Sequence, residues 1–350
     1  MELFDSHFHY YGETSPVEYF RNVMAEAAVP PQSDAGVPEK LYLMAAGGDY
    51  LESCRSREFA QVIETAYFAA GVHPHNADKF LAEANDFAVF RGHPKLKAIG
   101  ELGLDYFYEH SSRAEQMEVF RRFLELALAW DLPAIVHLRD KDGVWTAYED
   151  GLALLTPFAA AGGRFVVHCF SGTPAWAEKF LALGACLGVT GLVTFNRADN
   201  IRETLAVIPD DRLLIETDSP YLAPVPHRGV ENHPGFLVLI AARVAAERRR
   251  ELESIARLTT ETRAGFSGSR WSHEHFLPRG GGGPDGPGRS GRGSDRAARR
   301  PGDPLRHRTS AACRRVAGRR RPAGVRPSRR GGLFTRRRRK FARAGDVPGD

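Results

Sequence analysis

Eight short apolar runs constrain the fold of this chain more than any other feature of its sequence. They are LFDSH (3–7), LYLMAA (41–46), YFAAGV (67–72), LKAIGEL (96–102), PAIVHL (133–138), RFVVHCF (164–170), ACLGVTGLV (185–193) and RLLIETD (212–218). Residues 113–130 repeat apolar side chains at helical spacing, and residues 174–184 begin with Pro and end with Gly, as helices do. Strands that alternate with helices predict a parallel sheet, and eight such units in about 250 residues predict an α/β protein with a (β/α)8 TIM barrel. A doubly wound sheet is the alternative, but the first run is followed by histidines and not by a phosphate-binding loop.

The chain changes in composition after residue 268. Residues 269–350 contain 23 Lys and Arg against 6 Asp and Glu, whereas residues 1–268 contain 25 against 37. The basic part is rich in Arg, Gly and Pro and has no hydrophobic period, so it predicts disorder. We therefore expect a barrel domain at 1–268 and a disordered tail at 269–350. The tail is either the product of a frameshift in a GC-rich gene or a genuine basic arm that binds nucleic acid through its charge.

The sequence predicts a protein of the cytoplasm. No run of about 18 apolar residues occurs, so no membrane span is expected, and the first residues lack the basic and apolar segments of a secretory signal. The four cysteines, Cys54, Cys169, Cys186 and Cys313, show no paired spacing, which is typical of free thiols in a reducing compartment.

Side chains that can bind metals follow most of the predicted strands. They are His7 and His9 in and after the first run, His73 and His75 after the third, Glu101 and Asp105 at the end of the fourth, His137 in the fifth, His168 in the sixth, and Glu216 and Asp218 at the end of the eighth. In a TIM barrel the carboxyl ends of all strands meet at one rim, where the active site lies. Imidazole and carboxylate are ligands of Zn, Mn and related divalent ions. The sequence therefore predicts a metal centre at this rim.

Six of these side chains suit a pair of divalent ions: His7, His9, Glu101, His137, His168 and Asp218. The first and eighth strands are neighbours in a closed barrel, so His7, His9 and Asp218 suit one ion. His137 and His168 suit a second, and the two oxygens of Glu101 can bridge ions that in such centres lie about 3.5–4 Å apart. Asp218 is also placed to accept the proton of a metal-activated water. Glu101 and Asp218 are thus the candidate catalytic residues, and Mg, Mn and Zn are all compatible with this ligand set.

Two further side chains are candidates for substrate binding. His73 is expected either to contact a substrate phosphate or to support the end of its strand. Arg139 lies two residues beyond His137, so it is expected to point to the same side and to bind an anion, unless it forms a salt bridge with Asp140 or Asp142.

Three other polar residues near the rim have supporting roles in this interpretation. Glu216 is expected to accept a hydrogen bond from a metal ligand and so to orient it. Asp105 is expected to order its loop. Cys169 follows His168 directly, so it is expected to point to the opposite face of its strand, into the core.

Six motifs, in this order along the chain, resemble the TatD family of metal-dependent deoxyribonucleases: SHFH, GVHPH, AIGELGLDY, PAIVHLRD, VVHCFSG and LLIETDSPYLAP. The resemblance covers residues 1–267. It implies a TIM barrel that holds one or two divalent metal ions and hydrolyses phosphodiester bonds in DNA, in several members as an exonuclease. Carried over position by position, the metal ligands are the same six residues that the strand ends indicate.

We therefore expect a divalent-metal-dependent hydrolase that cleaves single-stranded DNA by means of a metal-activated water, as an exonuclease. A barrel of the wider amidohydrolase kind, acting on an amide or an ester, is an alternative because fold and metals do not fix the substrate. An inactive barrel that binds nucleic acid with the help of the basic tail is a second alternative.

Overall fold

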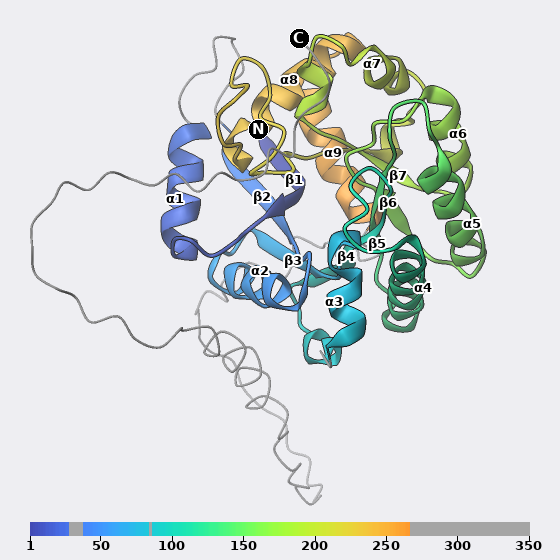
Figure 1. The fold of residues 1–350 in the computed structure, drawn as a ribbon. Helices are drawn as coiled ribbons and strands as arrows, with labels where there is room; N and C mark the ends of the chain where they lie inside the picture. The colour runs from blue at the N-terminus through green and yellow to red at the C-terminus, as the bar shows by residue number, and fades with distance from the viewer. Residues whose placement is uncertain (28–37, 84–85, 267–350) are drawn as a thin grey trace, which may run out of the picture.

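The computed structural model describes residues 1–27, 38–83 and 86–266. All eight predicted strands are present: β1 Glu2–His9, β2 Lys40–Ala46, β3 Ala66–Ala70, β4 Leu96–Asp105, β5 Ala134–Arg139, β6 Phe165–Val167, β7 Cys186–Val189 and β8 Leu213–Ile215. They form one sheet in the order β1 to β8, and each successive pair is parallel (Figure 1). The predicted TIM-barrel fold is confirmed.

Backbone hydrogen bonds join the end of the sheet to its beginning. The N–H of His9 donates to the carbonyl of Ser219 at 2.8 Å, and the N–H of Asp218 donates to the carbonyl of His7 at 2.9 Å. These bonds hold the segment after β8 beside the end of β1, so the sheet curves into a nearly closed barrel. His7, His9 and Asp218 therefore lie side by side.

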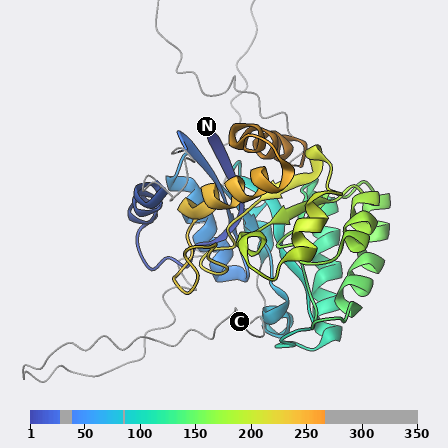
Figure 2. The same cartoon turned by 90° about the horizontal axis from the view of Figure 1, so that it is seen from above.

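Helices surround the barrel and connect its strands: α1 Pro16–Ala27, α2 Tyr50–Val62, α3 Ala77–Ala82, α4 Arg113–Trp130, α5 Thr146–Ala160, α6 Pro174–Ala182, α7 Asp199–Leu205, α8 Leu237–Arg248 and α9 Leu252–Phe266. The two predicted helices are α4 and α6. α4 begins at a capping box formed by Ser112 and Glu115, and α6 ends before Gly184, whose φ of +82° favours glycine. Figure 2 shows α8 and α9, in orange, beside β1, which both of them contact.

Apolar side chains pack in two layers, one inside the barrel and one outside it. Successive residues of a strand alternate between the layers, as Leu3 and Phe4 do on β1. The outer layer, to which Leu3 and Phe120 belong, joins the sheet to the helices. The inner layer consists of Phe4, Met44, Tyr67, Ala69, Ala98, Ile135, Val166, Cys186 and Leu214.

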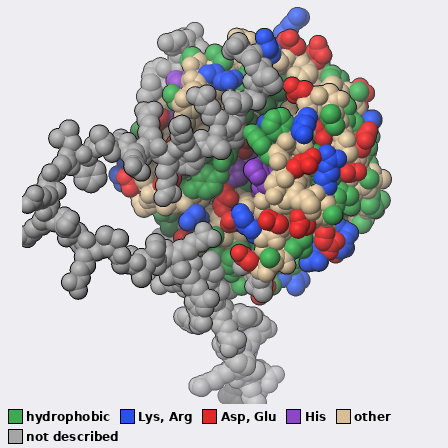
Figure 3. Space-filling model, in the orientation of Figure 1, with side chains coloured by type: hydrophobic (Ala, Val, Ile, Leu, Met, Phe, Trp, Pro, Cys, Tyr) green, Lys and Arg blue, Asp and Glu red, His purple; other side chains and the backbone are tan. Residues whose placement is uncertain are grey.

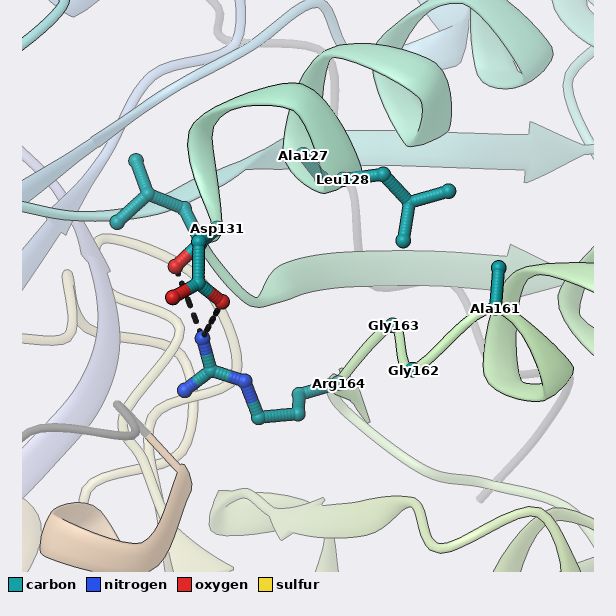
Figure 4. Close-up of a pocket in the computed structure, with 8 residues that line it drawn as sticks. Ala127, Leu128, Asp131, Ala161, Gly162, Gly163 and Arg164 are labelled. Atoms are coloured by element: carbon teal, nitrogen blue, oxygen red, sulfur yellow. Dashed lines mark hydrogen bonds and ion pairs between the residues drawn. The ribbon is translucent and has the colours of Figure 1, made fainter.

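The hollows at the two ends of the barrel differ in volume and in the residues that line them. At the amino ends of β5 and β6, a hollow of about 200 Å³ lies between the last turns of α4 and α5 (Figure 4). There the Arg164 guanidinium donates to the carbonyl and the carboxylate of Asp131, both at 2.8 Å. Contacts at this end of a TIM barrel serve its stability. A cavity of about 980 Å³ opens at the opposite end, where the strands have their carboxyl termini.

The predictions on membrane spans and thiols have different outcomes. Among the residues that the structure describes, none of the helices has the length and apolarity needed to cross a bilayer. Cys169 and Cys186 are free thiols, as predicted, whereas Cys54 is disulfide-bonded. The prediction is wrong for Cys54, because spacing along the sequence does not report which thiols pair. Cys313 and the predicted tail, residues 269–350, lie outside the described residues.

Candidate metal centre

The large cavity is lined by the residues that follow the strands. Five of the six predicted metal ligands line it, and His7 is buried beneath them with its ring stacked on that of His168 at 3.9 Å. Figure 3 shows histidine side chains, in purple, at the bottom of a hollow on the face drawn. The walls include aromatic and basic residues from the surrounding loops: Tyr11, Phe107, Tyr108, Arg139, Trp145, Phe195, Tyr221 and Arg228.

One group of ligand atoms comes from β1, β4 and the segment after β8. His7 Nε2 lies 3.3 Å from both His9 Nε2 and Glu101 Oε2. Asp218 Oδ1 lies 3.7 Å from His7 Nε2 and 3.6 Å from His9 Nε2, and Glu101 Oε2 also lies 3.6 Å from His9 Nε2. In a tetrahedral site with bonds of about 2.0–2.2 Å, the ligand atoms lie about 3.3–3.6 Å apart. His7 Nε2, His9 Nε2 and Asp218 Oδ1 therefore have the spacing of a first metal site, and Glu101 Oε2 lies beside its two imidazole nitrogens.

The surroundings of Glu101 also fit a cation. Its Oε2 is buried and accepts no hydrogen bond from any residue that the structure describes. A buried carboxylate oxygen without a donor is costly, and a bound cation removes that cost. The residues present therefore fit a divalent ion.

A second group gathers around the other oxygen of Glu101. Glu101 Oε1 lies 2.9 Å from His137 Nδ1 and 2.8 Å from His168 Nε2, and these two nitrogens lie 3.3 Å apart. His73 Nε2 lies 3.6 Å from the same oxygen, and its ring meets that of His137 edge-on. The carboxylate of Glu101 thus faces one histidine group with each oxygen. His73 stands within the second group, close enough to bind an ion as well as a substrate.

Glu52, which the sequence analysis does not single out, orients His9. Its Oε1 lies 2.7 Å from His9 Nδ1, and its Oε2 accepts from the N–H of Gly48 at 2.9 Å. With the proton on Nδ1, His9 presents the lone pair of Nε2 to the first group. A sequence signal exists: Asp49 caps α2 through the N–H of Glu52, as in a capping box, but the Glu52 carboxylate turns toward His9.

Asp105 does more than order its loop. Its Oδ1 accepts from the N–H groups of Phe107 at 3.1 Å and Tyr108 at 2.9 Å, which agrees with the expected loop role. Its Oδ2 lies 3.1 Å from His137 Nε2 and 3.0 Å from His75 Nε2. The carboxylate thus fixes the imidazole of His137 with Nδ1 toward the second group.

Glu216 is fully buried beside His168. Its Oε1 lies 3.4 Å from His168 Nδ1 and accepts from the N–H of Cys169 at 2.5 Å, and its Oε2 accepts from the Ser6 hydroxyl at 2.7 Å. This position suits an acceptor that orients a metal ligand. The prediction that Cys169 points into the core is wrong. β6 ends at Val167, and Cys169 has a φ of +47° and lines the cavity, so the alternation of a strand no longer applies there.

Burial and charge together set the protonation of the cluster. Burial by itself raises the pKa of Glu101, but the surrounding imidazoles, that of His168 foremost, outweigh it and hold this pKa well below its ordinary value. The pKa of Asp218 is also lowered, because the nearby imidazoles, that of His9 foremost, outweigh burial. Burial lowers the pKa of His168, but Glu101 and Glu216 raise it well above its ordinary value. Both carboxylates are therefore ionised at neutral pH, as metal ligands must be.

Arg139 lies in the cavity wall. The carbon of its guanidinium lies 4.5 Å from the centre of the Phe107 ring and 4.9 Å from that of Tyr108. In the described part of the chain no ion pair joins it to Asp140 or Asp142, and Asp140 instead caps the start of α5. The geometry therefore favours the anion-binding interpretation over the salt bridge.

The barrel is similar to known proteins. The family model described as "TatD related DNase" matches residues 4–265. The uncharacterized metal-dependent hydrolase YabD of Bacillus subtilis is 36% identical over 222 residues, which cover 63% of this chain and 84% of that protein. The 3'-5' ssDNA/RNA exonuclease TatD of Erwinia billingiae is 36% identical over 239 residues, 66% of this chain and 88% of that one. The crystal structure of YjjV, a TatD homolog from Escherichia coli K12, superposes with a TM-score of 0.63 at 27% identity, covering 75% of this chain and 97% of that one.

Proposed function

Because the chain belongs to the TatD family of metal-dependent hydrolases, we propose that it hydrolyses phosphodiester bonds in single-stranded DNA with two divalent ions. The six side chains that would hold the ions are His7, His9, Glu101, His137, His168 and Asp218. One observation carries the proposal: the buried Glu101 carboxylate faces one histidine group with each oxygen. Two divalent ions held by these residues would suit in-line displacement at phosphorus. Relatives named as 3'-5' ssDNA/RNA exonucleases support the single-stranded substrate and the exonuclease mode.

The side chains of the cluster have different roles in the proposed reaction. Divalent ions held by the six side chains would lower the pKa of water and bring positive charge to the phosphoryl oxygens. The side chain of Asp218 is 14% exposed and that of Glu101 2%, so the ionised Asp218 is the carboxylate able to accept the proton of the attacking water. Glu52 and Asp105 each hold a different histidine by a hydrogen bond to its other ring nitrogen, and the Glu216 carboxylate lies 3.4 Å from the corresponding nitrogen of His168. These contacts keep the ligating nitrogens in place.

Arg139 and His73 are the proposed contacts to the substrate phosphate. Contacts with the faces of Phe107 and Tyr108 hold the Arg139 guanidinium in the cavity wall, and its N–H groups are left for an anion. Burial holds the pKa of His73 well below its ordinary value, so this imidazole is neutral at pH 7 and can donate one hydrogen bond.

The test uses the full chain, stripped of metal and supplied in turn with Mg, Mn or Zn. A single-stranded oligonucleotide labelled at its 5′ end is assayed beside an ester and an amide substrate, with Glu101→Ala as control. We expect metal-dependent, stepwise shortening of the oligonucleotide, lost in Glu101→Ala. Cleavage of the ester or amide alone would support the amidohydrolase alternative. Oligonucleotide binding without cleavage of any substrate would support the inactive barrel.

The role of the tail and the cytoplasmic location stay predictions. If residues 269–350 form a basic arm, their removal should weaken DNA affinity and flatten its dependence on salt, because fewer counterions are released on binding. An unchanged affinity would favour the frameshift interpretation.

A further inference from the structure

Arg228 lies in the mouth of the cavity, and neither the metal centre nor the proposed phosphate contacts use it. It belongs to the loop after β8, and its guanidinium carbon lies 3.6 Å from the centre of the Phe195 ring in the loop after β7. Stacking on an aromatic face fixes the plane of a guanidinium but leaves the N–H groups in that plane unused. Among the residues that the structure describes, no carboxylate pairs with Arg228. Its donors are therefore available to an anion in the cavity.

The loop that carries Arg228 is held in place before any ligand arrives. The buried Asn232 side chain donates to two carbonyls at the base of the loop, at 2.8 and 2.5 Å. The N–H of Val225 donates to the hydroxyl of Thr194 at 2.9 Å, which ties the loop to the segment that carries Phe195. A side chain that is already positioned loses less entropy on binding. Arg228 and Phe195 are therefore already positioned in the cavity wall before a ligand binds.

Arg228 and Arg139 lie on opposite sides of the metal-ligand cluster. Arg139 ends β5 and its rings follow β4, whereas Arg228 and its ring lie in the loops after β8 and β7, and in an eight-stranded barrel these two sides lie across the mouth from each other. Neither guanidinium has an acidic partner among the described residues. Glu101 and the histidines lie between them. Two arginines, each in contact with an aromatic ring and placed on either side of one reactive centre, are suited to bind a ligand that carries successive anionic groups.

We propose that Arg228, backed by Phe195, binds a second phosphate of the substrate strand, next to the phosphate at the metal centre. The inference rests on the proposed phosphodiesterase function and narrows its substrate to a strand with at least two consecutive phosphodiesters. A guanidinium offers a phosphate two parallel, charge-assisted N–H···O bonds. Because Arg228 contacts the strand beyond the reacting phosphate, its loss affects strand substrates and not a small isolated phosphodiester.

The experiment compares Arg228→Ala and Arg228→Lys with the wild type, all in the metal-loaded full chain. The two substrates are a single-stranded oligonucleotide and bis(p-nitrophenyl) phosphate, which contains one phosphodiester. Binding of an oligonucleotide with slowly hydrolysed phosphorothioate linkages is measured in parallel, so that one readout does not depend on turnover. The control is Arg122→Ala, which removes the same charge from α4, where Arg122 pairs with Glu118.

We expect Arg228→Ala to raise KM for the oligonucleotide and Kd for the phosphorothioate strand about tenfold or more, as for other hydrogen bonds between charged groups. The slope of log Kd against log salt should fall by about 0.7, the value for one single-strand phosphate contact. For bis(p-nitrophenyl) phosphate, kcat/KM should stay within about twofold, and Arg228→Lys should be intermediate because Lys cannot form paired bonds.

Two results would overturn the proposal: an unchanged Kd for the strand in Arg228→Ala, or an equal loss on both substrates. A wild type that binds the strand through Arg228 but cleaves neither substrate would refute the proposed function and leave the second-phosphate site standing.

Discussion

Replacing Glu52 by Gln tests how the chain fixes its metal ligands. The carboxylate uses one oxygen for His9 Nδ1 and the other for the N–H of Gly48. A Gln amide has one acceptor and one donor. If the amide oxygen stays on Gly48, the amide N–H faces His9 Nδ1 and forces the proton of His9 onto Nε2, the atom directed at the first metal site. If the amide turns round, the buried N–H of Gly48 loses its acceptor.

Both arrangements weaken the first metal site or the fold around it. Loss of the partner that orients a ligating histidine lowers metal affinity about 10- to 100-fold, or about 1.4–2.8 kcal/mol. The turned amide leaves a buried N–H unsatisfied at a cost of about 1–3 kcal/mol. Because Gln and Glu have nearly the same volume, packing is unchanged. We therefore expect Glu52→Gln to lower the affinity of the first site by one to two orders of magnitude.

The assay is a titration of the metal-free protein with Mn or Zn against a competing chromogenic chelator. Glu58→Gln makes the same chemical change at an exposed position of α2 and is the control. We expect the loss in Glu52→Gln alone. Equal affinities of Glu52→Gln and the wild type would refute the reasoning, because Glu52 would then not determine which nitrogen of His9 carries the proton.

Two substitutions and one change of conditions test other parts of the structure. His168→Ala should bind one ion fewer by metal analysis, because it removes the nitrogen 2.8 Å from Glu101 Oε1; an unchanged count would contradict this. Metal affinity, measured by chelator competition, should rise as the pH increases from about 6 to about 8. The reason is that neighbouring carboxylates outweigh burial and raise the pKa of His137 and His168, so bound protons must leave these imidazoles before an ion can bind. A metal affinity that stays constant over this pH range would contradict this coupling of proton release to metal binding. Phe120→Ala should lower the free energy of unfolding by about 3–5 kcal/mol in urea denaturation, since this ring is fully buried between α4 and the sheet, and a loss below about 1 kcal/mol would mean that the outer layer is loosely packed.

The strands can be predicted from the sequence because the barrel buries both of their faces. Leu3 packs in the outer layer and Phe4 in the inner one, so both positions must be apolar and the strand appears as a continuous apolar run. The ends of the strands are less predictable. β6 ends at Val167, and Cys169 with its positive φ points where no strand pattern would place it.

The six candidate ligands can be predicted because a barrel gathers all strand ends at one rim. The residues that orient them are only partly predictable: Glu216 at the end of the eighth strand is expected in this role, whereas Glu52 and the reach of Asp105 to His137 are not. Glu52 lies on a helix, 43 residues from His9 in sequence. Asp105 is visible as a carboxylate at the end of β4, but only the fold shows that it reaches His137 on the neighbouring strand. These contacts depend on the direction of side chains and not on the order of elements.

The number of divalent ions bound per chain tests the proposed two-metal centre most directly. Metal-free protein is saturated with Mn or Zn, freed of excess ions and weighed by native mass spectrometry, beside Glu101→Ala. We expect two ions per chain in the wild type and the loss of at least one in Glu101→Ala, because the two oxygens of Glu101 face the two histidine groups. A wild type that binds no ion, or a Glu101→Ala variant that keeps both, would contradict the claim that this carboxylate joins two metal sites.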